Sequence, residues 1–128
     1  MKLMRNKLKK LMNRLGQHYF GIGMANYRLK AFTGAIDRFK QVIDNYPTFE
    51  KMGKLYYFTG KSYSMLRDYD SAISFFQKII NSLPKSKYVK GSKKNIQKLM
   101  KDKIISDRKK AEKKEVEKKE EEDTKKED

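Results

Sequence analysis

Apolar residues recur every three or four positions through most of this chain, which is the spacing of amphipathic helices. One stretch has its apolar positions at Ala35, Ile36, Phe39, Val42, Ile43 and Tyr46. A second stretch has the same spacing at Ala72, Ile73, Phe76, Ile79, Ile80 and Leu83. Each ends at a proline, Pro47 or Pro84, which cannot continue a helix. The pattern predicts an all-α chain with helices over 17–30, 33–46, 49–66 and 69–83.

The two stretches are copies of one unit, because a single offset of 37 residues aligns them. The offset also pairs Gly23 with Gly60 and Phe39 with Phe76. A fixed offset that keeps small, aromatic and proline positions together is typical of a helical repeat. We expect the glycines and alanines to sit where two helices cross closely, and the phenylalanines to fill the space between them.

The order of residue types resembles the tetratricopeptide repeat (TPR). The second copy supplies Tyr56, Gly60, Tyr63, Ala72, Phe76 and Pro84. The first copy supplies Tyr19, Gly23, Ala35, Phe39 and Pro47, with Asn26 where the second tyrosine belongs. The period exceeds the usual TPR length of about 34 residues. The resemblance covers roughly residues 17–90.

Three further features are similar to the repeats of BamD-type outer-membrane assembly lipoproteins and their periplasmic relatives. They are the Tyr-Pro ending, the longer connection and the phrase from Leu66 to Ala72. This resemblance implies a component of an outer-membrane protein assembly complex.

The expected fold is a short α-solenoid of two TPR hairpins with flanking capping helices and a charged tail. Its segments are a basic amphipathic helix over 1–15, the first repeat over 16–48, the second repeat over 49–85, a capping helix over 86–106 and a Lys/Glu-rich tail over 107–128. We expect Thr48, Asp68 and Ser86 to cap the helices that follow them. The capping helix should bury Val89, Ser92, Ile96, Leu99 and Met100. The tail has only Ala111 and Val116 as apolar residues, so we expect a helical start that frays into disorder.

The first fifteen residues carry one apolar stripe, made of Met4, Leu8, Leu11, Met12 and Leu15. Basic residues cover the rest of this helix. Such a helix can lie on an anionic membrane. It can also cap the open end of a solenoid with its apolar stripe. We favour the cap, and the membrane contact stays open as an alternative.

The charge lies at the two ends of the repeats. The chain has a net charge of +16, of which residues 1–14 carry +6 and residues 85–110 carry +9. Residues 15–84 carry only +4, and residues 111–128 carry −3. Basic flanks suggest anionic partners, and nucleic-acid or ribosome binding is therefore the alternative function. The acidic tail would oppose binding to phosphate.

No residue constellation points to catalysis. The chain has no cysteine and a single histidine, His18, which has no acidic or nucleophilic partner nearby in sequence. There is no phosphate-binding glycine loop and no cluster suited to a metal. We expect a non-enzymatic protein without cofactor or metal.

What remains is a protein-binding surface. The TPR resemblance implies that the first helix of each repeat lines a concave groove that binds a protein segment. The groove positions are Gln17, Phe20, Met24, Tyr27, Arg28, Lys54, Tyr57, Lys61, Ser64 and Met65. Exposed aromatic and methionine side chains would supply apolar pockets, and the cations would engage carboxylates. In the alternative, Phe20 and Met24 pack against the N-terminal helix instead.

The resulting hypothesis is a TPR adaptor that binds a peptide segment or an assembly subunit. No signal peptide and no lipidation cysteine are present in the sequence, which favours the cytoplasm. The BamD resemblance would place the protein in the periplasm at the outer membrane if its natural start lies upstream.

Overall fold

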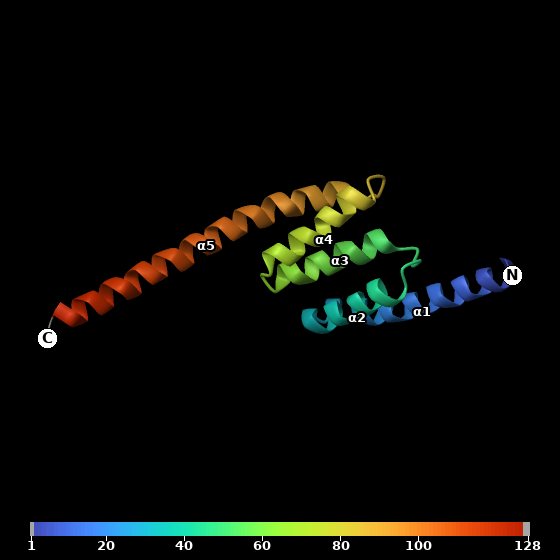
Figure 1. The fold of residues 1–128 in the computed structure, drawn as a ribbon, viewed down its shortest axis with the longest axis horizontal. Helices are drawn as coiled ribbons and strands as arrows, with labels where there is room; N and C mark the ends of the chain where they lie inside the picture. Colours follow the sequence, from blue (N-terminus) through green and yellow to red (C-terminus); the bar gives the residue numbers. More distant parts are fainter. Residues whose placement is uncertain (1, 127–128) are drawn as a thin grey trace.

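The computed structural model describes residues 2–126, and all of its regular structure is helical within that range. This confirms the predicted all-α solenoid. The elements are α1 (Lys2–Arg28), α2 (Phe32–Asn45), α3 (Met52–Met65), α4 (Tyr69–Ser82) and α5 (Val89–Lys126). Figure 1 shows two antiparallel hairpins, α1 with α2 and α3 with α4, stacked side by side, with α5 added after them.

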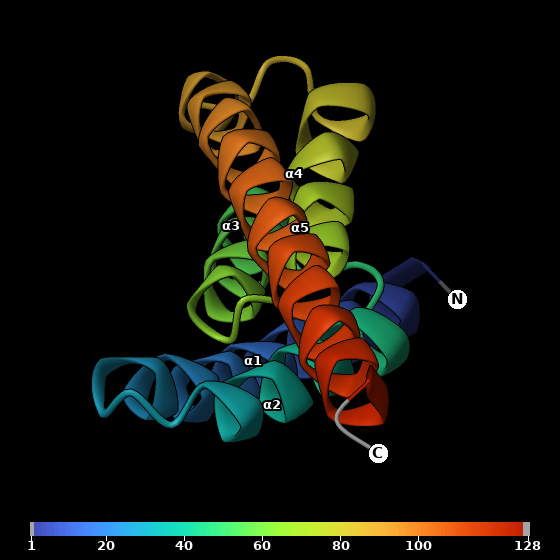
Figure 2. The same ribbon diagram turned by 90° about the vertical axis from the view of Figure 1, so that its left-hand side faces the viewer.

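The repeat is visible in the helix bounds. α2 and α4 both have 14 residues, and both their first and their last residues are 37 positions apart. Seen from the end in Figure 2, α1 and α2 form one layer that crosses the layer of α3 and α4. Neighbouring helices therefore pack in chain order, as expected for a solenoid.

Each hairpin closes where a glycine faces a phenylalanine. A Cβ atom added to Gly23 would lie 2.6 Å from Cε1 of Phe39. At the equivalent crossing, a Cβ atom on Gly60 would lie 3.0 Å from Cε1 of Phe76. Both phenylalanines are fully buried. The predicted role of these glycines and phenylalanines is thus confirmed.

The turns inside the two hairpins share one backbone conformation. Lys30 has φ 63° and Arg67 has φ 60°, the left-handed region that glycine adopts most easily. In the second turn the N–H of Asp68 donates to the carbonyl of Tyr63 at 3.0 Å, which ends α3. Asp68 also caps α4 as predicted, because its carboxylate accepts the N–H of Ser71 at 3.3 Å.

The connections between hairpins differ from the predicted caps. α3 begins at Met52 without any side-chain cap, so the prediction for Thr48 is wrong. The reason is that Phe49 turns inward at 3% exposure, and this displaces the helix start along the chain. Ser86 accepts the N–H of Tyr88 in the turn before α5 rather than capping its first residue.

The core consists of two clusters of buried side chains. The first joins α1, α2 and the start of α3, and contains Phe20, Met24, Ala35, Phe39, Val42, Phe49 and Leu55. The second joins α4 to the first part of α5, and contains Ala72, Phe76, Ile79, Ile96 and Leu99. Half-buried tyrosines of α3 pack against the second cluster and connect the two.

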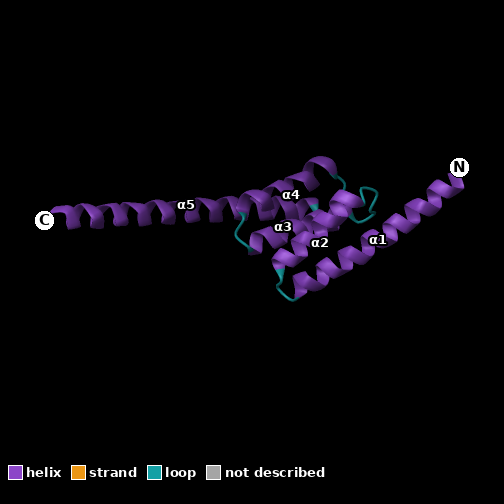
Figure 3. Cartoon of the chain, turned by 60° about the horizontal axis from the view of Figure 1, so that its bottom comes forward, coloured by secondary structure: helices purple, strands orange, loops and turns teal. Residues whose placement is uncertain are grey.

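The N-terminal segment differs from its prediction as a separate cap. α1 runs without a break from Lys2 to Arg28, so the described part of the N-terminal segment and the first TPR helix form one helix. Most of its apolar stripe is open to solvent, since Met4, Leu8 and Leu11 are 76%, 60% and 53% exposed, although Met12 is half-buried. Figure 3 shows this end of α1 projecting beyond the other helices.

α5 also extends further than expected. It buries Ser92, Ile96 and Leu99, but Met100 is 51% exposed, which corrects its predicted place in the core. The helix continues through the charged tail to Lys126, whereas the tail was expected to begin as a helix and then fray into disorder. Every described residue beyond Ser106 is exposed, and Figure 1 shows this part of α5 leaving the body of the protein.

Candidate protein-binding clefts

Two of the predicted groove residues belong to the core. Phe20 is 7% exposed and Met24 is 8% exposed, so neither can contact a partner without unfolding. The ring of Phe20 lies 5.7 Å from that of Phe39 and 5.5 Å from that of Phe49. They therefore pack against α2 and the α2–α3 connection, and not against the N-terminal half of α1 as the alternative held.

Tyr57 is also not a free groove residue. It is half-buried, and its ring lies 4.9 Å from the ring of Tyr88 and 5.6 Å from that of Phe76. Its hydroxyl oxygen accepts a hydrogen bond from Nδ2 of Asn95 at 3.4 Å. A Cβ atom on Gly91 would lie 3.4 Å from this tyrosine. Tyr57 therefore joins α3 to α5, which corrects its assignment to an open surface.

Tyr27 also packs between helices. Its ring lies 5.6 Å from Phe32 and 5.2 Å from Phe58, which places it between helices. Burial raises the pKa of Tyr27 above its ordinary value, with a smaller contribution from Tyr57.

The remaining predicted residues do reach the surface. Gln17, Arg28 and Met65 are exposed, and Lys54, Lys61 and Ser64 are half-buried. The ammonium of Lys54 lies 5.8 Å from the ring of Phe20, and that of Lys61 lies 5.7 Å from the ring of Tyr57. The two aromatic rings that were expected to line a groove thus make cation–π contacts with these lysines. The surface offered to a partner is therefore more polar than expected.

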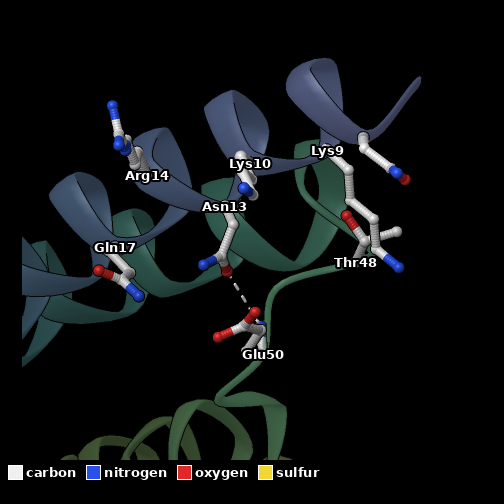
Figure 4. Close-up of a pocket in the computed structure, with 8 residues that line it drawn as sticks. Lys9, Lys10, Asn13, Arg14, Gln17, Thr48 and Glu50 are labelled. Atoms are coloured by element: carbon white, nitrogen blue, oxygen red, sulfur yellow. Dashed lines mark hydrogen bonds between the residues drawn. The ribbon is translucent and has the colours of Figure 1, made fainter. Parts of the chain in front are cut away.

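A polar cleft contains the first of these residues, Gln17. It has a volume of about 620 Å³ and lies between the N-terminal half of α1 and the α2–α3 connection. Its lining residues are Asn6, Lys9, Lys10, Asn13, Arg14, Gln17, Thr48 and Glu50. Figure 4 shows Asn13 and Gln17 pointing from α1 toward Glu50. The side-chain oxygen of Asn13 accepts the backbone N–H of Glu50 at 3.2 Å, and this bond fixes the cleft wall.

A second cleft of about 390 Å³ lies at the equivalent place in the next unit, between the start of α3 and the α4–α5 connection. Its lining residues are Glu50, Lys51, Gly53, Lys54, Ser86, Lys87 and Tyr88. The offset of 37 residues relates Arg14 to Lys51 and Gln17 to Lys54. The two clefts are therefore one feature of the repeat, present twice, and Glu50 lines both.

The clefts are strongly basic. They contain six cations, Lys9, Lys10, Arg14, Lys51, Lys54 and Lys87, against the single carboxylate of Glu50. Among residues 2–126 the one ion pair joins Lys103 to Asp70 at 2.6 Å, where the carboxylate raises the pKa of the lysine. The cleft cations thus have no carboxylate partner within the described chain.

The residues that sequence reasoning missed lie on the N-terminal half of α1. Asn6, Asn13 and Gln17 are spaced as neighbours on one helical face, with Lys9 and Lys10 between them. The spacing is visible in the sequence. The expected boundary at residue 15, however, assigns Asn6 and Asn13 to a separate capping helix. Only because α1 is unbroken do these residues share one face with Gln17.

Other kinds of site have little support in the described part of the chain. No group of three or more histidine, aspartate or glutamate side chains there could hold a metal ion. None of the helices in the described range is long and apolar enough to cross a membrane. His18 stacks edge-on against Tyr19, with ring centroids 5.3 Å apart.

Comparison with known proteins identifies the two repeats. A family model described as tetratricopeptide repeat matches residues 19–48 and 51–86, which together make up just over half of the chain. A search of curated proteins finds no match. The two matched segments cover the two helical hairpins except for the part of α1 before Tyr19, and they end in the connection after α4.

Proposed function

Because the chain belongs to the tetratricopeptide repeat family, we propose that it is a non-enzymatic adaptor that binds an acidic, extended segment of a partner protein along its two basic clefts. TPR domains typically bind protein partners, and the family is generally non-enzymatic. We infer that the bound segment is acidic because the clefts are basic.

One observation carries the proposal: six cations line two equivalent clefts and have no acidic partner in the described chain. Lysine and arginine side chains held near one another repel, and a ligand carboxylate relieves this repulsion while accepting charge-assisted hydrogen bonds. The amides of Asn13 and Gln17 and the hydroxyl of Thr48 add neutral donors to the first cleft. A segment with carboxylates spaced along its length would match both clefts at once.

An extended segment fits better than a compact ligand. The two clefts are open, lie one repeat apart and share Glu50 as a common wall. This carboxylate interrupts the positive surface, so a uniformly charged polymer such as nucleic acid meets one repulsive position. A peptide can place a neutral or basic residue beside Glu50 and its acidic residues on either side.

The test is binding of a fluorescent twelve-residue peptide of alternating glutamate and serine to the full chain, followed by anisotropy. Lys9→Glu together with Lys51→Glu reverses one exposed cation in each cleft. Removing each charge-assisted hydrogen bond should cost about 1.5–3 kcal/mol, so the dissociation constant should rise by more than about tenfold. The matched control is Lys118→Glu with Lys119→Glu, the same charge change on the exposed part of α5, which should weaken binding far less.

The same assay tests the other partners that the sequence suggested. A single-stranded DNA probe of equal charge, binding tightly at physiological salt while the peptide does not, would favour nucleic acid. Phosphate contacts also show a steep linear dependence on salt through counterion release. Binding that the control variant weakens as much as the cleft variant would show that net charge, and not the clefts, is responsible.

We further propose outer-membrane protein assembly as the cellular role, on the resemblance of the Tyr-Pro endings and the turn before α4 to BamD-type repeats. This role requires the protein to be outside the cytoplasm. Cell fractionation followed by affinity capture with wild-type and cleft-variant chains tests both points. Capture of assembly subunits from the envelope fraction, abolished in the cleft variant, is the expected result; recovery only from the cytoplasm would contradict this role.

A further inference from the structure

The first helix of each unit has a face that receives the last helix of the unit before it. In α3 this face contains Leu55, Thr59 and Ser62, spaced as neighbours along one side of the helix, and all three are fully buried. Leu55 packs into one cluster with Phe39 and Val42 of α2. The two hydroxyl groups donate to backbone carbonyls of α3 itself, so this face needs no polar partner.

α5 repeats the arrangement one unit later. The offset of 37 residues takes the three α3 positions to Ser92, Ile96 and Leu99. These are 0%, 8% and 5% exposed, and the two apolar ones cluster with Phe76 and Ile79 of α4. In both cases a helix with an apolar stripe covers the face.

The equivalent face of α1 is open. The same offset leads back to His18, Ile22 and Ala25, of which His18 and Ala25 are exposed and Ile22 is half-buried. Among the described helices, α1 packs mainly against α2 and makes only a small contact with α3. A Cβ atom added to Gly21, next to this face, would meet nothing within 4 Å.

The open face continues through the projecting half of α1. Leu15, Leu11, Leu8 and Met4 follow Ile22 at helical spacing, with exposures of 37%, 53%, 60% and 76%. The unpaired apolar stripe of the N-terminal segment and the unoccupied stacking face are therefore one surface. It runs along nearly the whole of α1.

We propose that this surface docks an amphipathic helix of a partner protein, one with acidic residues beside its apolar stripe. A helix is the occupant because α2 and α4 cover the same positions on α3 and α5. Gly21 and Ala25 leave room for the close backbone approach of another helix, whereas a helix that lies on a membrane typically carries Trp, Phe and Leu on its apolar face.

The charge beside the stripe sets the chemistry of the partner. Arg5 neighbours Leu8, while Lys7 and Arg14 neighbour Leu11 on the helix surface. α1 contains no acidic residue at all between Lys2 and Arg28. A second copy of α1 would therefore be repelled, and a helix with acidic flanks would be attracted.

The test uses the full chain and two peptides with the sequence of residues 31–47, which includes the helix that covers the α3 face. Both carry a hydrocarbon staple across the exposed positions Thr33 and Asp37 to hold them helical. One peptide keeps the natural charges, and the other has Arg38→Glu and Lys40→Glu. The acidic peptide should bind with a dissociation constant at least about tenfold lower than that of the first.

Leu11→Glu should weaken binding of the acidic peptide by at least about tenfold, and Met65→Glu, at a residue of similar exposure on α3, should leave it unchanged. Circular dichroism should show that both variants stay folded. The cleft variant Lys9→Glu with Lys51→Glu should retain binding within about threefold, which separates this surface from the clefts. Absence of saturable binding up to about 1 mM peptide would overturn the proposal. So would equal losses in Leu11→Glu and Met65→Glu.

Vesicles of phosphatidylcholine with phosphatidylglycerol provide the contrasting probe. If the wild-type chain sediments with these vesicles, the Leu11→Glu variant does not, and neither peptide binds, the face belongs to an anionic membrane and the helix proposal is overturned. Peptide binding without such vesicle binding would support the proposal.

Discussion

A methyl group at Gly23 should destabilise the fold, whereas the same group two residues earlier should stabilise it. A Cβ atom on Gly23 would lie 2.6 Å from Cε1 and 2.7 Å from Cδ1 of Phe39, and 3.3 Å from Cβ of Arg38. Phe39 is fully buried and contacts the ring of Phe20, so its ring has no space to move into. Overpacking of this kind typically costs about 1–3 kcal/mol.

An opposing effect comes from the backbone. Alanine is favoured over glycine inside a helix by about 1 kcal/mol. At Gly23 the overpacking should outweigh this gain, so Gly23→Ala should lower the free energy of unfolding by up to about 2 kcal/mol. At Gly21 a Cβ atom meets nothing, so Gly21→Ala should raise it by about 0.5–1 kcal/mol. Gly60→Ala should fall between them, because its closest approach to Phe76 is 3.0 Å.

Urea unfolding followed by circular dichroism measures all three variants against wild type. The predicted order of stability is Gly21→Ala, then Gly60→Ala, then Gly23→Ala. If Gly23→Ala proves as stable as Gly21→Ala, the crossing of α1 and α2 is not as close as described, and the explanation of the repeat fails at its central crossing.

Further predictions concern the turns, the cap and the packing of α3 on α5. Arg67→Gly should raise the free energy of unfolding by up to about 1 kcal/mol in urea titrations, because glycine adopts positive φ freely; a loss of stability would contradict the turn conformation. Asp68→Ala should lower the free energy of unfolding by about 0.5–2 kcal/mol, because α4 loses its cap, while Asp68→Asn should retain most of this stability. Tyr57→Ala should lower the thermal midpoint clearly, because the ring of Tyr57 packs on that of Tyr88. Met65→Ala should change the midpoint little, because Met65 is exposed. Equal, small effects of the two changes would show that Tyr57 lies on an open surface after all.

The parts of the fold that the sequence predicts are those encoded within one repeat. Gly23 with Phe39, and Gly60 with Phe76, recur at a fixed offset because each hairpin solves the same packing problem. Asp68 is recognisable as a cap because capping involves residues only three positions apart. Local chemistry of this kind can be read without knowing what lies next to the hairpin.

The binding surface is harder to predict because it depends on packing between units. Phe20 occupies a position that resemblance assigns to a groove, yet Phe49 arrives from the next connection and buries it. Tyr57 stands 37 residues later and is covered in the same way by Tyr88. The spacing of apolar residues in α1 does not reveal the contact between Phe20 and Phe49. The spacing in α3 likewise does not reveal the contact between Tyr57 and Tyr88.

The helix ends show the same limit. Gly16 is the first residue after the predicted boundary at 15, but it lies inside α1. A Cβ atom there would lie 2.9 Å from Cδ2 of Phe49. The glycine reflects a close approach and not a chain break. This misplaced boundary separates Asn13 from Gln17, and the first cleft therefore cannot be assembled from the sequence.

The central claim, that the basic clefts bind an acidic segment, is tested most directly by nuclear magnetic resonance of the isotopically labelled full chain with the glutamate–serine peptide. The side-chain amides of Asn6, Asn13 and Gln17 report on the first cleft, and those of Gln77 and Asn81, which hydrogen-bond to each other on α4 at 3.2 Å, serve as internal controls. We predict saturable shifts of the cleft amides and of the backbone around Lys51 and Lys87, with Gln77 and Asn81 unchanged. Shifts confined to the basic part of α5 beyond Ser92, with the cleft amides unmoved, would contradict the account.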